Sequence, residues 1–253
     1  MALRDYFELW RLAGARRRSE EDYRVFQAFQ ARLILRYLER QGVETSRGHV
    51  LDLGSGVGGY GSEFARGGAD VVAVDLGDPG GPSPSGVRPV QASALALPFG
   101  SETFDFVFCA SLIEHVPDPA RVLSEIERVL KPRGFAYVSF PPYWSPIGGH
   151  QFSPYHYLGE RLAIRLAGRR GRGPDWAHRR LEVPDHPQSF AELFGSWGLY
   201  RMTVAGMRRL IAASRLECLD LSTRYLPVSF VRWPVLGEVL TWHAQFLLRK
   251  RRS

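Results

Sequence analysis

Residues 50–61 read VLDLGSGVGGYG, an apolar run that turns abruptly into glycines, and this stretch constrains the fold most strongly. The helical EFARG and a second apolar run, DVVAVDL, follow it. Strand, glycine turn, helix and strand in this order predict a βαβ unit. Gly54 and Gly56 open a GxGxxG pattern that, read with Asp52, also satisfies DxGxGxG. Such glycines let the backbone turn tightly and approach a ligand.

An acid ends the second of these apolar runs. Asp75 follows the glycine turn at the distance where a carboxylate accepts both hydroxyl hydrogen bonds of a ribose. The combined pattern therefore predicts a cofactor that contains a nucleoside. The alternative is a purely structural glycine turn with Asp75 as a helix cap.

The rest of the chain continues this alternation of strands and helices. Further strands are predicted over residues 87–92, 104–111, 134–140, 215–227 and 240–250, and helices over 19–42, 118–130 and 203–214. For residues 240–250 a helix is the alternative, but a strand is favoured. We therefore predict an α/β fold, a Rossmann-like seven-stranded mostly parallel sheet with helices on both faces, N-terminal helices and an insertion after the fifth strand.

The chain is interpreted as a single domain over residues 1–253. Many prolines, glycines and aromatic residues interrupt the rhythm after Phe140, where only one helix is predicted, over 157–168. The parts are an N-terminal helical cap (1–47), a cofactor-binding core (48–140), a substrate-pocket insertion (141–200), and a C-terminal helix and strands that complete the sheet (201–253).

Composition narrows the class of protein. The 33 basic residues exceed the 26 acidic ones, giving a formal charge of +7, but the basic residues are dispersed, which favours solvated surface over nucleic-acid binding. Cys109 and Cys218 lie in apolar stretches without metal-ligand spacing, so we expect two buried thiols in a reducing compartment. No apolar run reaches signal-peptide or membrane-span character, and a soluble cytoplasmic protein is expected.

Three blocks of sequence carry a family resemblance. They are VLDLGSGVGG, ALPFGSETFDFVFCASLIEHVPDP and VLKPRGFAYVSFP, in this order along the chain. Over roughly residues 48–140 the chain resembles the class I S-adenosylmethionine-dependent methyltransferases, specifically the methyltransferase type 11-like group that acts on small molecules. The second and third blocks have no counterpart in hydride-transfer Rossmann proteins, which argues against a dehydrogenase.

The resemblance implies S-adenosylmethionine as cofactor and S-adenosylhomocysteine as product. Asp52 and the glycines would line the methionine end, Asp75 would hold the ribose, and Ser111 would border the sulfonium. Where the family usually has an acid for the adenine amine, this chain has Ser93, whose hydroxyl accepts a hydrogen bond without charge assistance. The implied cofactor residues are Asp52, Gly54, Gly56, Asp75, Leu76, Ser93, Ala94 and Ser111.

The sequence FPPY, residues 140–143, is similar to a motif of methyltransferases that act on exocyclic amines of bases. Phe140 offers no acceptor where those enzymes carry Asn, Asp or Ser, and the segment follows the fifth predicted strand instead of the fourth. A nucleic-acid methyltransferase is therefore disfavoured. Instead we predict a substrate pocket at the carboxyl edge of the sheet. The aromatic residues that would enclose it are Tyr143, Trp144, Phe152, Tyr155 and Tyr157.

Histidines in this region supply candidate general bases. His150 is the first choice because Gly148 and Gly149 would let the backbone approach a pocket, His156 is second and His115 third. A structural role for each is the alternative. No metal is predicted, since His150, His156, Asp185 and His186 show no diagnostic ligand spacing.

The favoured function is methyl transfer to a small-molecule hydroxyl. GGHQFSPYHYLG resembles an actinobacterial subgroup found beside glycan or lipid enzymes, which favours a glycan, lipid-linked or secondary-metabolite acceptor. A non-catalytic cofactor-binding partner protein is the alternative from another class. The run from Phe230 to the basic C-terminus leaves peripheral membrane contact open, although core packing is favoured, and the oligomeric state stays undetermined.

Overall fold

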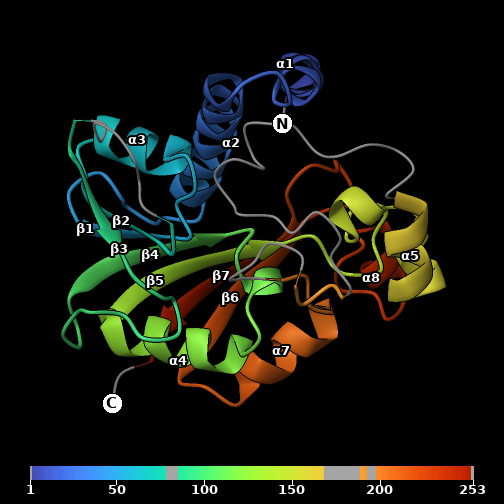
Figure 1. Ribbon diagram of the computed structural model, residues 1–253. Coiled ribbons are helices and arrows are strands. Elements are labelled where there is room, and N and C mark those ends of the chain that lie inside the picture. The colour runs from blue at the N-terminus through green and yellow to red at the C-terminus, as the bar shows by residue number, and fades with distance from the viewer. Residues whose placement is uncertain (1, 78–84, 168–188, 193–197, 252–253) are drawn as a thin grey trace.

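The computed structural model describes residues 2–77, 85–167, 189–192 and 198–251. A seven-stranded sheet runs in the order β3-β2-β1-β4-β5-β7-β6 (Figure 1). The first five strands pair in parallel, and β7 is antiparallel to both of its neighbours. The predicted α/β, mostly parallel sheet is confirmed. The strands are β1 (His49–Leu53), β2 (Asp70–Asp75), β3 (Val87–Gln91), β4 (Phe104–Ala110), β5 (Leu130–Phe140), β6 (Leu216–Thr223) and β7 (Ala244–Lys250).

Helices cover both faces of this sheet. In Figure 1, α2 and α3 lie on one face, and α4 and α7 lie on the other. The α-helices are α1 (Leu3–Ala15), α2 (Glu20–Arg40), α3 (Gly59–Arg66), α4 (Pro119–Val129), α5 (Glu160–Ala167), α7 (Val204–Ala212) and α8 (Leu236–Leu240), with short 3-10 helices η1 (Ile113–His115), η2 (His150–Phe152) and η3 (Tyr155–Leu158). None of the helices in the described ranges combines the length and apolar character that crossing a bilayer requires.

Strand β4 shows why the sheet is buried on both sides. Phe106 and Phe108 pack into the core under α2 and α3, whereas Val107 and Cys109 pack into the core under α4 and α7. Because both faces are covered, a continuous apolar run suits this strand better than alternation with polar residues. Each buried phenylalanine contributes about 1.5–3 kcal/mol of transfer free energy.

The ends of α2 follow the sequence signals. The Ser19 side chain accepts a hydrogen bond from the Asp22 backbone N–H at 3.0 Å, which caps the first turn. The helix ends at Arg40, and Gly42 follows in the left-handed region with φ 74°. The predicted capped helix is confirmed, and its last residue lies two positions before the predicted end.

Tight packing joins α2 to the glycine turn. A Cβ atom at Gly59 would lie 2.6 Å from both the Arg24 carbonyl oxygen and the Gln27 Cβ, so only glycine fits there. The Gln27 side chain in turn accepts a hydrogen bond from the Gly59 N–H at 3.1 Å. Helix α2 therefore packs directly against the loop predicted to hold the cofactor.

Strand β7 inserts between β5 and β6, and its predicted strand character is confirmed. Ala244 pairs with Phe140 on one side and with Thr223 on the other. The residues just before β7 and just after β6 therefore lie at the same edge as the carboxyl ends of β4 and β5. One cysteine prediction is wrong: Cys109 is buried, but Cys218 is exposed, because β6 is an edge strand.

The segment that follows β5 folds back on itself. A Cβ at Gly148 would lie 2.1 Å from the Pro142 carbonyl oxygen, and one at Gly149 would lie 2.3 Å from the His156 ring. These glycines therefore permit close packing within the segment, which corrects the expectation that they let the backbone approach a pocket. Tyr143 and Phe152 form a small core there with Ala163, Phe190 and Leu199. The predicted bounds of the insertion stay a prediction.

Candidate active site

The turn after β1 adopts the conformation that its glycines suggested. Gly54, Gly56 and Gly58 have φ values of 78°, 54° and 78°, in the left-handed region that favours glycine. The N–H of Gly54 donates to the Val74 carbonyl at 2.8 Å, which ties the turn to the end of β2. A Cβ at Gly54 would lie 3.0 Å from Leu112 Cβ, so the loop beyond β4 closes over the same turn.

The carboxylate of Asp75 faces this turn from the end of β2. Its Oδ2 accepts a hydrogen bond from the Gly56 N–H at 2.8 Å, and its Oδ1 accepts one from the Gly77 N–H at 3.2 Å. Leu76 follows with 42% of its side chain exposed. A half-buried carboxylate beside an exposed apolar residue fits the ribose and adenine of a nucleoside, the roles predicted for Asp75 and Leu76.

Asp52 lies below the turn, and 1% of it is exposed. One carboxylate oxygen lies close to the Gly61 backbone, where an added Cβ would be 3.0 Å away. Burial, with the nearby Asp75 charge adding to it, raises the pKa of Asp52 to about 7, although the Gly61 N–H opposes this shift. Asp52 contacts the backbone at Gly61. Its contact with the methionine end of the cofactor stays a prediction.

Ser93 lies after β3, where the family usually has an acid. Its Oγ accepts a hydrogen bond from the Leu95 N–H at 3.2 Å, so the hydroxyl caps a local turn, and Ala94 beside it is buried. One lone pair of Oγ is used within the turn, and the contact of the second with an adenine amine stays a prediction.

Ser111 follows β4 in the left-handed region, with φ 54°. Its backbone N–H donates to the Ser139 carbonyl at 2.8 Å, and its exposed hydroxyl lies 3.2 Å from His243 Nε2. Non-glycine residues with positive φ are uncommon and cluster at functional sites. The sequence did not single out His243, which the antiparallel β7 brings to this edge.

A cluster of three titratable side chains lies just beyond Ser111. Glu114 Oε1 is 3.9 Å from His115 Nε2 and 3.8 Å from His150 Nε2, and the two imidazole rings stack with centroids 4.7 Å apart. The His115 Nδ1 bonds to the Gly198 carbonyl at 2.7 Å, which assigns its proton to Nδ1. His150 has φ 49°, a second positive-φ residue at this edge.

Burial controls the charges of this cluster. It raises the pKa of Glu114 to about 8, with the Glu114 backbone N–H and the Arg224 charge opposing the shift. It lowers the pKa of His115 to about 3 and that of His150 to about 4, and a neighbouring histidine lowers each further. All three groups are therefore largely neutral at pH 7. Neither oxygen of Glu114 has a hydrogen-bond partner among the described residues.

The same donor set is chemically able to bind a divalent metal ion. One carboxylate and two imidazole nitrogens lie within 4.8 Å of one another. The four residues considered for a metal from the sequence share only His150 with this cluster. His156 is not part of the cluster, and Asp185 and His186 lie outside the described residues. The prediction that no metal is used stays a prediction.

The predicted catalytic and pocket residues divide into separate groups. His115 and His150 come together, whereas His156 is 1% exposed and packs among Tyr143, Tyr157 and Gly149. Tyr143 and Phe152 are buried in the small core of the segment, and Tyr155 packs against it. Trp144 and Tyr157 instead line a groove on the outer surface.

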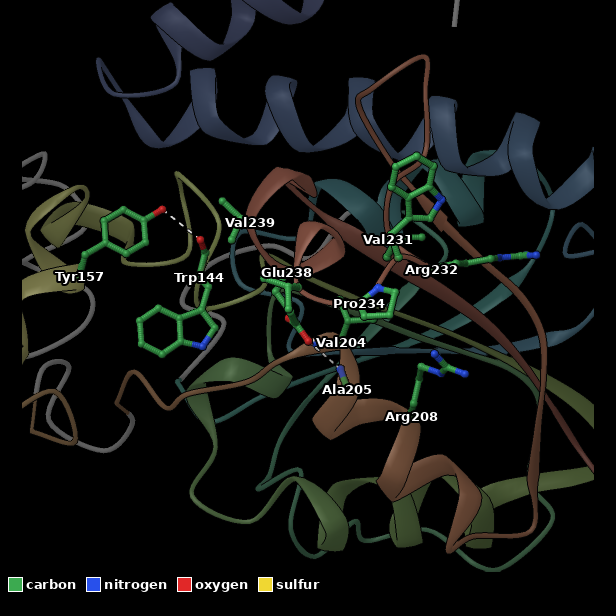
Figure 2. Close-up of a pocket in the computed structure, with 12 residues that line it drawn as sticks. Trp144, Tyr157, Val204, Ala205, Arg208, Val231, Arg232, Pro234, Glu238 and Val239 are labelled. Atoms are coloured by element: carbon green, nitrogen blue, oxygen red, sulfur yellow. Dashed lines mark hydrogen bonds between the residues drawn. The ribbon is translucent and has the colours of Figure 1, made fainter.

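This groove has a volume of about 670 Å³ and lies between the segment after β5, the start of α7 and α8 (Figure 2). Glu238 of α8 reaches across it and accepts hydrogen bonds from the Val204 and Ala205 N–H groups at 2.9 and 2.8 Å. The lining is mainly apolar: Trp144, Tyr157, Val204, Ala205, Arg208, Val231, Arg232, Trp233, Pro234, Val235, Glu238 and Val239.

We expect the free energy of unfolding to fall as the pH rises from about 6.5 to 8.5, and Glu114→Gln to remove most of this fall. The folded protein keeps the Glu114 proton up to about pH 8, whereas the unfolded chain loses it near 4.5, so this stabilisation is full below 4.5 and lost toward 8. The lowered histidine pKa values act in the opposite direction, but only below about 6.5. Urea unfolding of both proteins across this range measures the difference, and parallel curves would contradict the assignment.

A glycine turn after the first strand of a parallel sheet, an acid after the second strand and a polar cluster after the fourth define a nucleotide-type cofactor site of the Rossmann-like methyltransferase kind. The residues fit S-adenosylmethionine: the turn presents bare glycine backbone with positive φ, and Asp75 and Leu76 offer the carboxylate and the apolar surface that a nucleoside requires.

Comparisons with known proteins agree. Residues 51–138 match the family described as "Methyltransferase domain". An uncharacterized methyltransferase of Mycobacterium sp. (strain JLS) is 31% identical over 191 residues, covering 68% of this chain and 75% of that protein. The chain therefore belongs to the S-adenosylmethionine-dependent methyltransferases, and S-adenosylmethionine is its cofactor.

Solved structures support the fold. An S-adenosylmethionine-dependent methyltransferase from Mesorhizobium loti matches with a TM-score of 0.56 at 19% identity, covering 86% of this chain and 97% of that one. A Burkholderia thailandensis 1,6-didemethyltoxoflavin-N1-methyltransferase, solved with bound 1,6-didemethyltoxoflavin and S-adenosylhomocysteine, matches with a TM-score of 0.53 at 16% identity, covering 100% of this chain and 92% of that one. The individual site residues stay predictions.

Proposed function

We propose that this methyltransferase acts on a hydroxyl oxygen of a small-molecule acceptor bound at the carboxyl edge of the sheet. The observation that carries the proposal is the Glu114 carboxyl group, which is 2% exposed and lies 3.8 Å from His150 Nε2 just beyond Ser111. A hydroxyl gains most from such a base, because its proton must leave as the new carbon–oxygen bond forms.

In this proposal His150 accepts the hydroxyl proton, and Glu114 stabilises the imidazolium that results. When bound, the cofactor supplies an electrophilic methyl group on a sulfonium, which leaves as a neutral thioether. His150 is a weak base while Glu114 is protonated, but ionised Glu114 would raise the histidine's pKa, since opposite charges favour each other's charged forms. His115, held by Gly198, serves to position the His150 ring through stacking.

The groove supports an acceptor with an apolar part, as in a lipid-linked molecule. Trp144 and Tyr157, two of the aromatic residues predicted to enclose substrate, line it. A bound aliphatic chain would remove apolar surface from water at about 25 cal/mol per Å². The proposed acceptor is thus a hydroxyl of a glycan, a lipid-linked molecule or a secondary metabolite, and the groove favours one that carries an apolar part.

The test is calorimetric titration with S-adenosylhomocysteine, followed by transfer of a labelled methyl group to a panel of hydroxyl, amine and thiol acceptors with and without lipid tails. Binding together with label on a hydroxyl is the expected result. Label only on nitrogen, the atom that the Burkholderia enzyme's name indicates for that protein, would overturn the oxygen assignment. Binding without transfer to any acceptor would favour the non-catalytic alternative.

A further inference from the structure

Arg224 follows directly after β6 and is 8% exposed at the edge of the sheet where the site lies. Its Nη2 donates to the Tyr60 hydroxyl at 3.2 Å, and its Nη1 lies 3.4 Å from His243 Nε2. Its Nε has no hydrogen-bond partner among the described residues. A guanidinium has five N–H donors, so these contacts leave most of its donor capacity unused.

Among the described residues, the charge of Arg224 has no counter-ion either. No described carboxylate forms an ion pair with it, and its close neighbours are the rings of Tyr60 and Tyr225, with centroids 5.7 and 5.5 Å from the guanidinium carbon. The acid whose pKa its charge affects is Glu114, which is largely protonated at pH 7. Buried charges in proteins are normally paired, because leaving one unpaired costs several kcal/mol.

Two connections place this cation beside the reacting groups. His243 Nε2 faces both the Arg224 guanidinium and the Ser111 hydroxyl. Only the His243 side chain therefore separates Arg224 from Ser111, the residue predicted to border the sulfonium. Tyr60, on the first turn of α3, donates its hydroxyl proton to Gln30 Oε1 at 2.5 Å while it accepts from Arg224. Arg224 is thus fixed between the glycine turn and the end of β4.

We infer that Arg224 binds an anionic group, a carboxylate or a phosphate, of the ligand that occupies this edge of the sheet. A guanidinium suits such groups because its planar fork donates two parallel hydrogen bonds to their oxygens. The inference rests on the proposed function, because it assigns an anionic group to a ligand of that site. The same chemistry has two sources here, an anionic acceptor or the amino-acid carboxylate of the cofactor.

The first experiment uses inorganic phosphate as the probe. We measure the rise in Tm of the protein when phosphate replaces chloride at constant ionic strength, with and without S-adenosylhomocysteine. The wild type is expected to show the rise and Arg224→Gln to lose it. Arg224→Lys, which keeps the charge without the fork, is expected to keep less than half. Arg215→Gln, which removes an arginine whose side chain is 72% exposed, is the matched control and should behave as wild type.

The second experiment separates the two sources. S-adenosylhomocysteine and 5′-methylthioadenosine are titrated against wild type and both Arg224 variants, because only the first ligand carries a carboxylate. If Arg224 holds the cofactor, Arg224→Gln weakens S-adenosylhomocysteine ~10-fold or more and leaves 5′-methylthioadenosine unchanged. If it holds the acceptor, both affinities stay unchanged and only the phosphate effect is lost.

The inference would be overturned if the Arg224 variants bind both nucleosides as the wild type does and the Tm measurement also fails. That measurement fails if phosphate raises the Tm of the wild type and both variants equally, or does not raise the Tm of the wild type. Arg224→Lys keeps the buried positive charge and so supplies the comparison if Arg224→Gln does not fold. Failure of the wild type to bind S-adenosylhomocysteine would count against the proposed function instead, and the phosphate measurement without nucleoside stands independently of it.

Discussion

Asp75→Ala is expected to weaken binding of S-adenosylhomocysteine about 100-fold or more, since two hydrogen bonds from ribose hydroxyls to a carboxylate contribute roughly 1.5–3 kcal/mol each. The substitution also releases the Gly56 N–H, which donates to this carboxylate at 2.8 Å, so the glycine turn loses an anchor. Isothermal titration calorimetry of the two proteins measures the change directly.

Two further variants make this result specific. Asp75→Asn keeps an oxygen that can accept from Gly56, so its remaining loss of affinity reports chiefly on the ribose contact. Asp70→Ala removes an exposed acid from the other end of β2 and should leave the affinity unchanged. An undiminished affinity in Asp75→Ala would mean that the nucleoside does not lie at the end of β2.

His150→Ala is the second large expected effect. Once an acceptor is known, turnover should fall by roughly 10²- to 10⁴-fold, the usual contribution of a general base, while the affinity for S-adenosylhomocysteine stays intact. The reason is positional, because His150 lies against Glu114, whereas most of the predicted cofactor residues lie in or directly after β1 and β2. The readouts are kcat by single-turnover kinetics and Kd by calorimetry.

A pH profile distinguishes this chemical role from a structural one. Wild-type turnover should rise toward about pH 8 as Glu114 ionises, and Glu114→Gln should lower it and flatten the profile. His49→Ala, on the exposed start of β1, should leave the profile unchanged. Turnover in His150→Ala equal to that of the wild type would reject the general-base role.

The cofactor half of the protein is largely predictable from sequence because its signals are local. The glycine turn, the acid after β2 and the apolar runs of β1 and β4 each lie within a few residues, and the parallel order follows from the βαβ rule. Ser19 illustrates this best, since a cap and three following acids indicate where α2 begins, and its side chain accepts the expected N–H.

The proposed acceptor side of the site depends on contacts between residues that are distant in sequence. Arg224 and His243 read as ordinary residues at the ends of two strands, and only the antiparallel insertion of β7 brings them beside Ser111. Glu114 was visible in the IEH stretch, but sequence gives no sign that its carboxyl group would be buried against two histidines. Gly148 and Gly149 show the opposite error, since a loop that packs on itself has the same composition as one that lines a pocket.

The order of the strands also affects how the chain is assembled during synthesis. Strand β7 is made after β6 but lies between β6 and β5, so until β7 inserts β6 has no neighbouring strand and β5 pairs only with β4. Until then β5 presents an unpaired edge, a feature that makes partly folded chains prone to aggregate. The glycine turn after β1 and the end of β2 can form while the ribosome is still translating β6. The contact between Arg224 and His243 can form only afterwards, so a nascent chain has the glycine turn and Asp75 in place before this edge of the site is complete.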